Sequence, residues 1–169
     1  MRKAILVTLA VVLILGGVFI SGQFTPAQAN EPTILEFTTM VGITSAFTGT
    51  QNPIRGINGG GLPWTLTSAK GELKGSGQLE LNIQGLVLAA GANAGTNPIP
   101  NFRAIVSCLT VDGGADNVTS GLFPATLGAA VNGGGNAKIE TTLSLPTPCI
   151  APLVFITSPS GAWFAATGK

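Results

Sequence analysis

Two cysteines, Cys108 and Cys149, are the most reactive side chains of a sequence that contains no histidine. A cysteine nucleophile needs a neighbouring base, most often histidine, and a structural zinc site usually takes four cysteine or histidine ligands. The sequence meets neither requirement, so we predict that the two cysteines form a disulfide. The bond would close a span of 41 positions (149 − 108), which corresponds to about 4 kcal/mol if loop entropy is its whole effect.

Glutamates are the other candidates for catalysis. Glycosidases use two carboxylic side chains, one on either side of the bond that is cleaved. Glu80 and Glu140 fall on the solvent faces of alternating segments, and no pattern brings them close to Glu36 or Glu72. The motifs of serine hydrolases, nucleotide-binding loops and dinucleotide-binding folds are absent as well. We therefore predict no catalytic residues and a protein that is not an enzyme.

The segment "DGGADN" (residues 112–117) is the candidate metal site. Asp112, Asp116 and Asn117 carry the oxygen ligands that a calcium ion prefers. The 12-residue EF-hand pattern is absent, however, and the glycines are typical of a hairpin loop. We prefer the hairpin and predict no metal site and no cofactor.

Trp64 and Trp163 are the candidate ligand-binding residues. An exposed tryptophan offers a flat, apolar surface to a sugar ring or an apolar compound. The flanking sequences, "LPWTL" and "GAWFAAT", are apolar on both sides, which instead favours a place in the core. The positions of the two indoles decide between these interpretations.

Residues 1–29 are typical of a secretory signal peptide. Two basic residues open the chain, residues 4–20 are almost wholly apolar, and "AQA" (residues 27–29) matches a cleavage site. We expect cleavage after Ala29 and a secreted domain over residues 30–169. The alternative is an uncleaved N-terminal helix that anchors the protein in a membrane. Export to an oxidising compartment also favours the disulfide.

Alternating hydrophobicity predicts an all-β domain. Segments 77–88 ("GQLELNIQGLVL") and 137–145 ("AKIETTLSL") alternate between apolar and polar residues, as half-buried strands do. Segments 102–111 ("FRAIVSCLTV") and 152–157 ("PLVFIT") are apolar on both faces, which indicates strands that are covered on each side. The prolines of "SLPTPCIAP" predict a connector around Cys149 rather than a central strand.

Glycine clusters separate these segments, at residues 58–61, 75–77, 112–114 and 132–135. Such clusters provide the positive-φ positions that tight turns require. We therefore predict a single-domain antiparallel β-sandwich of about seven to nine strands, with a partly closed β-barrel as the alternative.

Charge limits the kinds of partner. Without residues 1–29, the chain has six basic and seven acidic residues, for a net charge of −1. Sparse, mixed charge provides neither the basic patch of a nucleic-acid-binding protein nor a polybasic segment for a membrane surface. The expected partner is an unknown protein or surface.

Four motifs carry a family resemblance: "GGLPW", "FRAIVSCLT", "SLPTPCIAPLVFIT" and "GAWFAATG". Together they resemble a group of small exported bacterial all-β proteins with two cysteines in similar settings. The resemblance covers roughly residues 62–168 and implies no activity, cofactor or catalytic residue. The segment "GSGQLELNIQGLVL" is also similar to the CHRD domain, but the histidine-containing stretch that follows in that family is absent here.

The sequence thus predicts an exported extracellular or cell-surface module with an interaction or structural role. Two alternatives are open. One is a domain that binds a small sugar or apolar compound through Trp64 or Trp163, and the other is an unrecognised hydrolase.

Overall fold

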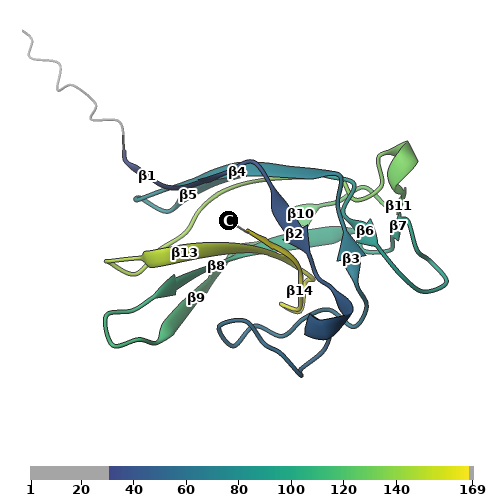
Figure 1. Ribbon diagram of the computed structural model, residues 1–169. Helices are drawn as coiled ribbons and strands as arrows, with labels where there is room; N and C mark the ends of the chain where they lie inside the picture. The colour runs from purple at the N-terminus through teal and green to yellow at the C-terminus, as the bar shows by residue number, and fades with distance from the viewer. Residues whose placement is uncertain (1–30, 168–169) are drawn as a thin grey trace, which may run out of the picture.

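The computed structural model describes residues 31–167, which form an all-β structure built of packed antiparallel sheets (Figure 1). The predicted signal peptide lies outside the described residues. Between residues 31 and 167, no helix has the length and apolar character needed to span a membrane.

One layer is a four-stranded sheet with the order β1-β4-β5-β12. Its strands are β1 (Thr33–Phe37), β4 (Ser68–Lys74), β5 (Gln78–Gln84) and β12 (Ala137–Thr142). The alternation predicted for β5 is confirmed, because Leu79, Leu81 and Ile83 are buried while the polar residues between them face outward. This sheet therefore has an apolar inner face and a polar outer face.

The second layer is a six-stranded sheet. Its strands are β2 (Met40–Gly42), β14 (Trp163–Thr167), β13 (Ile150–Thr157) and β8 (Asn101–Leu109), with β9 (Ala115–Thr119) and β10 (Phe123–Pro124) both paired to the outer edge of β8. β8 and β13 lie in the middle of the sheet; β8 is buried over most of its length and β13 over its second half. Their central position explains why both segments are apolar on both faces.

Two short pairs lie at one end of the sandwich (Figure 1). β3 (Trp64–Thr65) pairs with β6 (Val87–Leu88), and β7 (Thr96–Asn97) pairs with β11 (Gly128–Ala129). Two 3₁₀ turns, η1 (Ser45–Phe47) and η2 (Ala130–Asn132), complete the elements.

The core fills the space between the two sheets. The four-stranded sheet contributes Leu73, Leu79 and Ile139, and the six-stranded sheet contributes Phe102 and Val106, all without exposed surface. Eight strands have five or more residues, as the predicted sandwich requires, and the described residues form no closed barrel. The predicted β-sandwich is confirmed.

The glycine cluster at residues 58–61 has a different role from the predicted one. Gly59 forms a parallel bridge to Trp163 instead of a tight turn, and a Cβ atom on Gly59 would lie 2.0 Å from the carbonyl oxygen of Phe47. Glycine is needed here for close approach of the backbone, not for a positive φ. The other clusters do contain positive-φ glycines, among them Gly77, Gly113 and Gly133.

Candidate functional site

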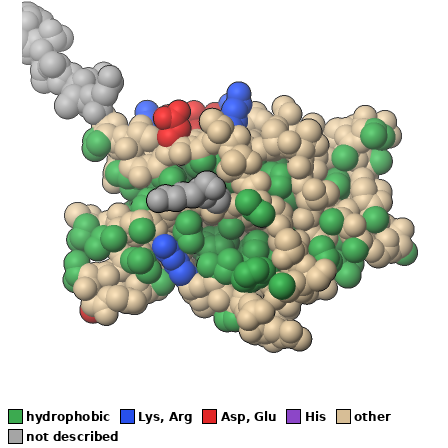
Figure 2. Space-filling view, viewed as in Figure 1, with side chains coloured by type: hydrophobic (Ala, Val, Ile, Leu, Met, Phe, Trp, Pro, Cys, Tyr) green, Lys and Arg blue, Asp and Glu red, His purple; other side chains and the backbone are tan. Residues whose placement is uncertain are grey.

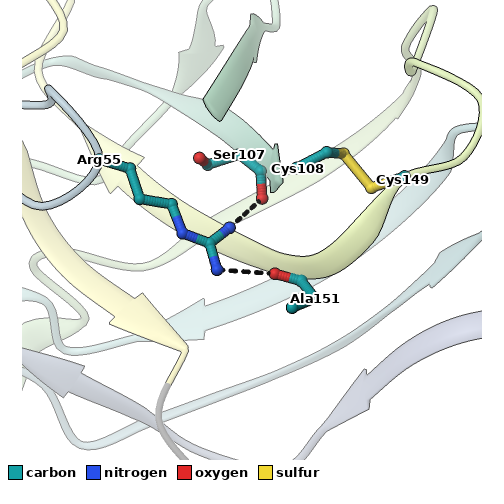
Figure 3. Close-up of a disulfide and its surroundings, with 5 residues drawn as sticks. All are labelled: Arg55, Ser107, Cys108, Cys149 and Ala151. Atoms are coloured by element: carbon teal, nitrogen blue, oxygen red, sulfur yellow. Dashed lines mark hydrogen bonds between the residues drawn. A yellow bond between two sulfur atoms is a disulfide. The ribbon is translucent and has the colours of Figure 1, made fainter. Parts of the chain in front are cut away.

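Cys108 and Cys149 form the predicted disulfide, with their Cα atoms 4.9 Å apart (Figure 3). Cys108 is fully buried and shares its face of β8 with Phe102, Ala104 and Val106. The bond joins β8 to the residue that immediately precedes β13. Since these are the only cysteines of the chain, neither supplies a free thiol for chemistry.

Next to this disulfide, the backbone hydrogen bonding between β8 and β13 is interrupted, and the Arg55 side chain bridges the gap. The pairing of β13 with β8 shifts register between Ile150 and Leu153, where Pro152 has no backbone N–H to donate. The Arg55 guanidinium donates from Nη1 to the carbonyl of Ser107 (2.8 Å) and from Nη2 to that of Ala151 (2.9 Å) (Figure 3). The predicted connector thus ends at Cys149, and the last proline lies within β13 at a bulge.

Arg55 belongs to a segment, residues 43–63, that we call the cover segment because it lies on the outer face of the six-stranded sheet (Figure 1). Arg55 and Gly56 both have positive φ, in a two-residue turn closed by hydrogen bonds between Ile54 and Ile57. Partial burial lowers the pKa of Arg55 from its ordinary value. Asn117 of β9 donates to the Arg55 carbonyl (2.9 Å), so the turn is anchored on both sides.

Trp64 is a core residue. Its side chain is 4% exposed and stacks on Phe164 with ring centroids 4.0 Å apart, while Phe102 meets it edge-on at 6.4 Å. The aromatic cluster fills the interior and leaves no indole surface for a ligand.

Trp163 is also 4% exposed, but it lies beneath the cover segment. The β13–β14 pairing shifts register between Ile156 and Thr157, and this bulge places Trp163 opposite Thr157 on the outer face of the sheet. Trp163 packs there against Phe155 and Phe47, at 6.0 and 6.2 Å. Ordinary alternation turns its neighbour Phe164 to the inner cluster.

A small apolar pocket opens beside Trp163. It has a volume of about 210 Å³, and its lining includes Val41, Phe47, Ile54 and Ala166. The indole Nε1 of Trp163 is buried and has no hydrogen-bond partner among the described residues. A buried donor without an acceptor is unfavourable, and the Trp163 indole therefore combines an unpaired Nε1 with a ring that lines an apolar hollow.

The outer face of the four-stranded sheet carries a row of glutamates that the sequence did not reveal. The register places Glu36 opposite Glu72, Glu72 opposite Glu80, and Glu80 opposite Glu140. Directly opposed side chains have Cβ atoms about 4.5–5.5 Å apart. The four carboxylates, one from each strand, form what we call the glutamate row. Alternation predicted the outward direction of Glu80 and Glu140, but only the strand register aligns all four.

Three lysines accompany the glutamate row. Lys74 pairs with Glu72 at 3.4 Å, and Lys138 pairs with Glu140. The hydrogen bond to Glu140 raises the pKa of Lys138, and the charges of Glu140 and Glu80 raise it further. Lys70 has no ion pair within residues 31–167. Figure 2 shows acidic and basic side chains gathered over this sheet, and a shallow groove of about 300 Å³ runs among them.

The glutamate row is poorly arranged for glycoside hydrolysis. A glycosidase needs its two carboxyl groups on opposite sides of the scissile bond, whereas these side chains project in parallel from one open face. Across residues 31–167, no group of three or more acidic, cysteine or histidine side chains is arranged to hold a metal ion. "DGGADN" spans the hairpin loop between β8 and β9 and the first three residues of β9, where the side-chain amide of Asn117 donates to the Arg55 carbonyl.

No protein-family model, curated protein or solved structure matches this chain.

Proposed function

We propose that this protein is an exported, non-catalytic interaction module whose contact surface is the outer face of the four-stranded sheet. One observation carries the proposal: seven of the twelve charged side chains between residues 31 and 167 lie on this face. They are Glu36, Lys70, Glu72, Lys74, Glu80, Lys138 and Glu140. Charged groups on a flat, rigid surface determine which partner binds and how fast it associates.

The stability cost of the glutamate row supports the same proposal. Like charges directly opposite one another destabilise a sheet, and a neutral polar residue at any of the four positions would avoid that cost. A local conflict of this kind is expected at functional surfaces, where folding is not the only constraint. The disulfide supports export, since such bonds persist in oxidising compartments.

The test compares two variants in a secreting host. In the first, all four members of the glutamate row are replaced by Gln; in the matched control, Asp112 and Asp116 of the β8–β9 hairpin are replaced by Asn. We expect the first variant to lose retention at the cell surface and appear in the medium, while the control is retained like the wild type. Equal retention of all three proteins would contradict the proposal. The mass of the wild type should correspond to a chain that begins at Asn30.

A second candidate function is binding of a small, mostly apolar molecule in the Trp163 pocket. The apolar lining beside Trp163 favours a small apolar ligand. Titration with ethylbenzene should shift the indole N–H resonance of Trp163 and leave that of Trp64, which lies in the core, unchanged. A Trp163 resonance that does not shift would rule out this ligand class.

A further inference from the structure

We infer that the charged face binds the same face of a second copy of this chain, across a twofold axis parallel to the glutamate row. The inference names a partner for the contact surface proposed above and rests on that proposal. It comes from the order of the charges along the strands, which makes the face complementary to itself.

The outward residues form two neighbouring rows of opposite character. The first is the glutamate row. The second row lies two residues away from the first on each of three strands. It contains Lys70 of β4, Asn82 of β5 and Lys138 of β12, which the register places side by side. Two residues of a strand span about 6.6–6.8 Å, so Glu72, Glu80 and Glu140 each have a basic or amide position at that distance, whereas the corresponding position beside Glu36 is Thr38.

Consider a twofold axis that lies at the interface of the two copies, midway between these rows and parallel to both. It places each row of one copy against the other row of the second copy. It reverses the strand direction but preserves the position across the sheet, so each strand faces the same strand of the second copy. Glu72 then faces the second copy's Lys70, and Glu140 faces the second copy's Lys138. Each contact occurs twice, as a closed twofold interface requires.

The other face-to-face arrangement is unfavourable. A twofold axis parallel to the strands preserves the position along each strand, so it would place one glutamate row directly against the other. Like charges placed against one another across an interface strongly disfavour that arrangement. The charge pattern therefore selects one orientation and one register of the two copies.

The charges left unpaired within one copy support this arrangement. Within residues 31–167, the ion pairs join Lys74 to Glu72 and Lys138 to Glu140. Lys70, Glu36 and Glu80 have no such pair. The second copy supplies a carboxylate to Lys70 and an amide, from Asn82, to Glu80. It therefore gives Lys70 an ion pair that one copy lacks, and it adds a second partner to Glu80, which within one copy accepts a hydrogen bond from Gln78.

The size of the face indicates a weak dimer. Four strands at about 4.8 Å and seven residues at about 3.3 Å give an area of roughly 440 Å² per copy, about half of what a stable interface buries. Affinity in the micromolar range or weaker, with a strong dependence on salt, is the expected behaviour.

Sedimentation equilibrium of the mature protein tests the inference with two charge-reversed variants. The acidic-face variant carries Lys70→Glu and Lys138→Glu, and the basic-face variant carries Glu72→Lys and Glu140→Lys. We expect the wild type to dimerise at low ionic strength and to dissociate at least about tenfold more readily at about 0.5 M salt. Each variant alone should be monomeric, and an equimolar mixture should form heterodimers. Circular dichroism verifies that both variants are folded.

Asp116→Lys is the matched control, because it reverses an exposed charge on β9 of the other sheet and should leave the wild-type dimer unchanged. A wild type that stays monomeric at low salt, or variants that do not combine on mixing, would overturn the inference. If the wild type is monomeric but the variant with Gln at all four positions of the glutamate row still loses retention at the cell surface, a second copy is excluded as the partner. The proposed contact surface then stands. If dimers form while retention is unaffected, the inference stands and the cell-surface role fails.

Discussion

The outer faces of the two sheets are built in opposite ways. The outer face of the four-stranded sheet is uncovered and carries seven charged side chains in ordered rows. The outer face of the six-stranded sheet is apolar around Phe155 and Trp163 and lies under the cover segment, which Arg55 fastens to β8 and β13. Both sheets share one core, so the difference lies in the side chains of each outer face and in what covers them.

This difference predicts that one outer face contributes mainly to stability and the other mainly to association. Side chains beneath the cover segment are closely packed, so their loss should lower the free energy of unfolding. Side chains of the charged face contact mainly water and one another, so their loss should change binding and leave the fold nearly unaffected.

The largest effect is expected from Trp163→Ala. The substitution removes a buried aromatic side chain that packs against Phe47 and Phe155, and such a loss costs about 3–5 kcal/mol. Glu80→Ala on the opposite face is the matched comparison and should change stability by no more than about 0.5 kcal/mol. Chemical denaturation followed by circular dichroism measures both. A small effect of Trp163→Ala would mean that the cover segment contributes little to the fold.

Removal of the disulfide should come next, at about 2–5 kcal/mol. Cys108→Ala and Cys149→Ala should be equally destabilised, and the double variant little worse than either, because all three lose the same bond. Denaturation curves of the three variants give the comparison. Clearly additive effects would show that the two side chains also contribute separately.

The fold could be predicted from the sequence because its signals are local. Alternation in β5 and β12 identified the strands and their buried faces, and the lack of histidine left the disulfide as the role for two cysteines. Strand register is not local. Nothing in the neighbourhood of Glu36 or Glu72 indicates that these residues face each other, because the pairing of β1 with β4 depends on the assembled sheet.

The place of Trp163 was difficult to predict for a related reason. Its flanks correctly indicate burial, but the bulge in the β13–β14 pairing decides that Trp163, rather than Phe164, faces outward. The residues that cover Trp163 come from about a hundred positions earlier in the chain. The close approach of Gly59 to β14 is visible only once both segments are placed.

Arg55→Ala should have an intermediate effect. It removes two hydrogen bonds from a charged donor to the carbonyls of Ser107 and Ala151. Because Arg55 is only partly buried, we expect a loss of about 1–2 kcal/mol. Arg55→Lys should recover only part, since an ammonium group cannot reproduce the two-pronged geometry. Thermal unfolding of Arg55→Ala and Lys70→Ala checks the expectation, because Lys70 is an exposed cation without these contacts. Equal effects of the two substitutions would contradict it.

Glu80→Gln should have the smallest effect and the opposite sign. Glu80 lies between Glu72 and Glu140 in the glutamate row, and removal of one like charge should stabilise the monomer by about 0.2–0.5 kcal/mol at low salt. The gain should disappear in high salt, where exposed charges are screened. Destabilisation of the monomer would show that the carboxylate contributes to the fold.

The most direct test of the contrast between the two faces is a dilution series of ¹⁵N-labelled mature protein followed by amide chemical shifts at low salt. If the charged face is the contact surface, the shifts that change with concentration should map to the outward residues of β4, β5 and β12, around Lys70, Glu80 and Lys138. The amides of the cover segment, including Arg55, should not move. Concentration-dependent shifts centred on the cover segment, or a spectrum that is the same at every concentration, would contradict the account.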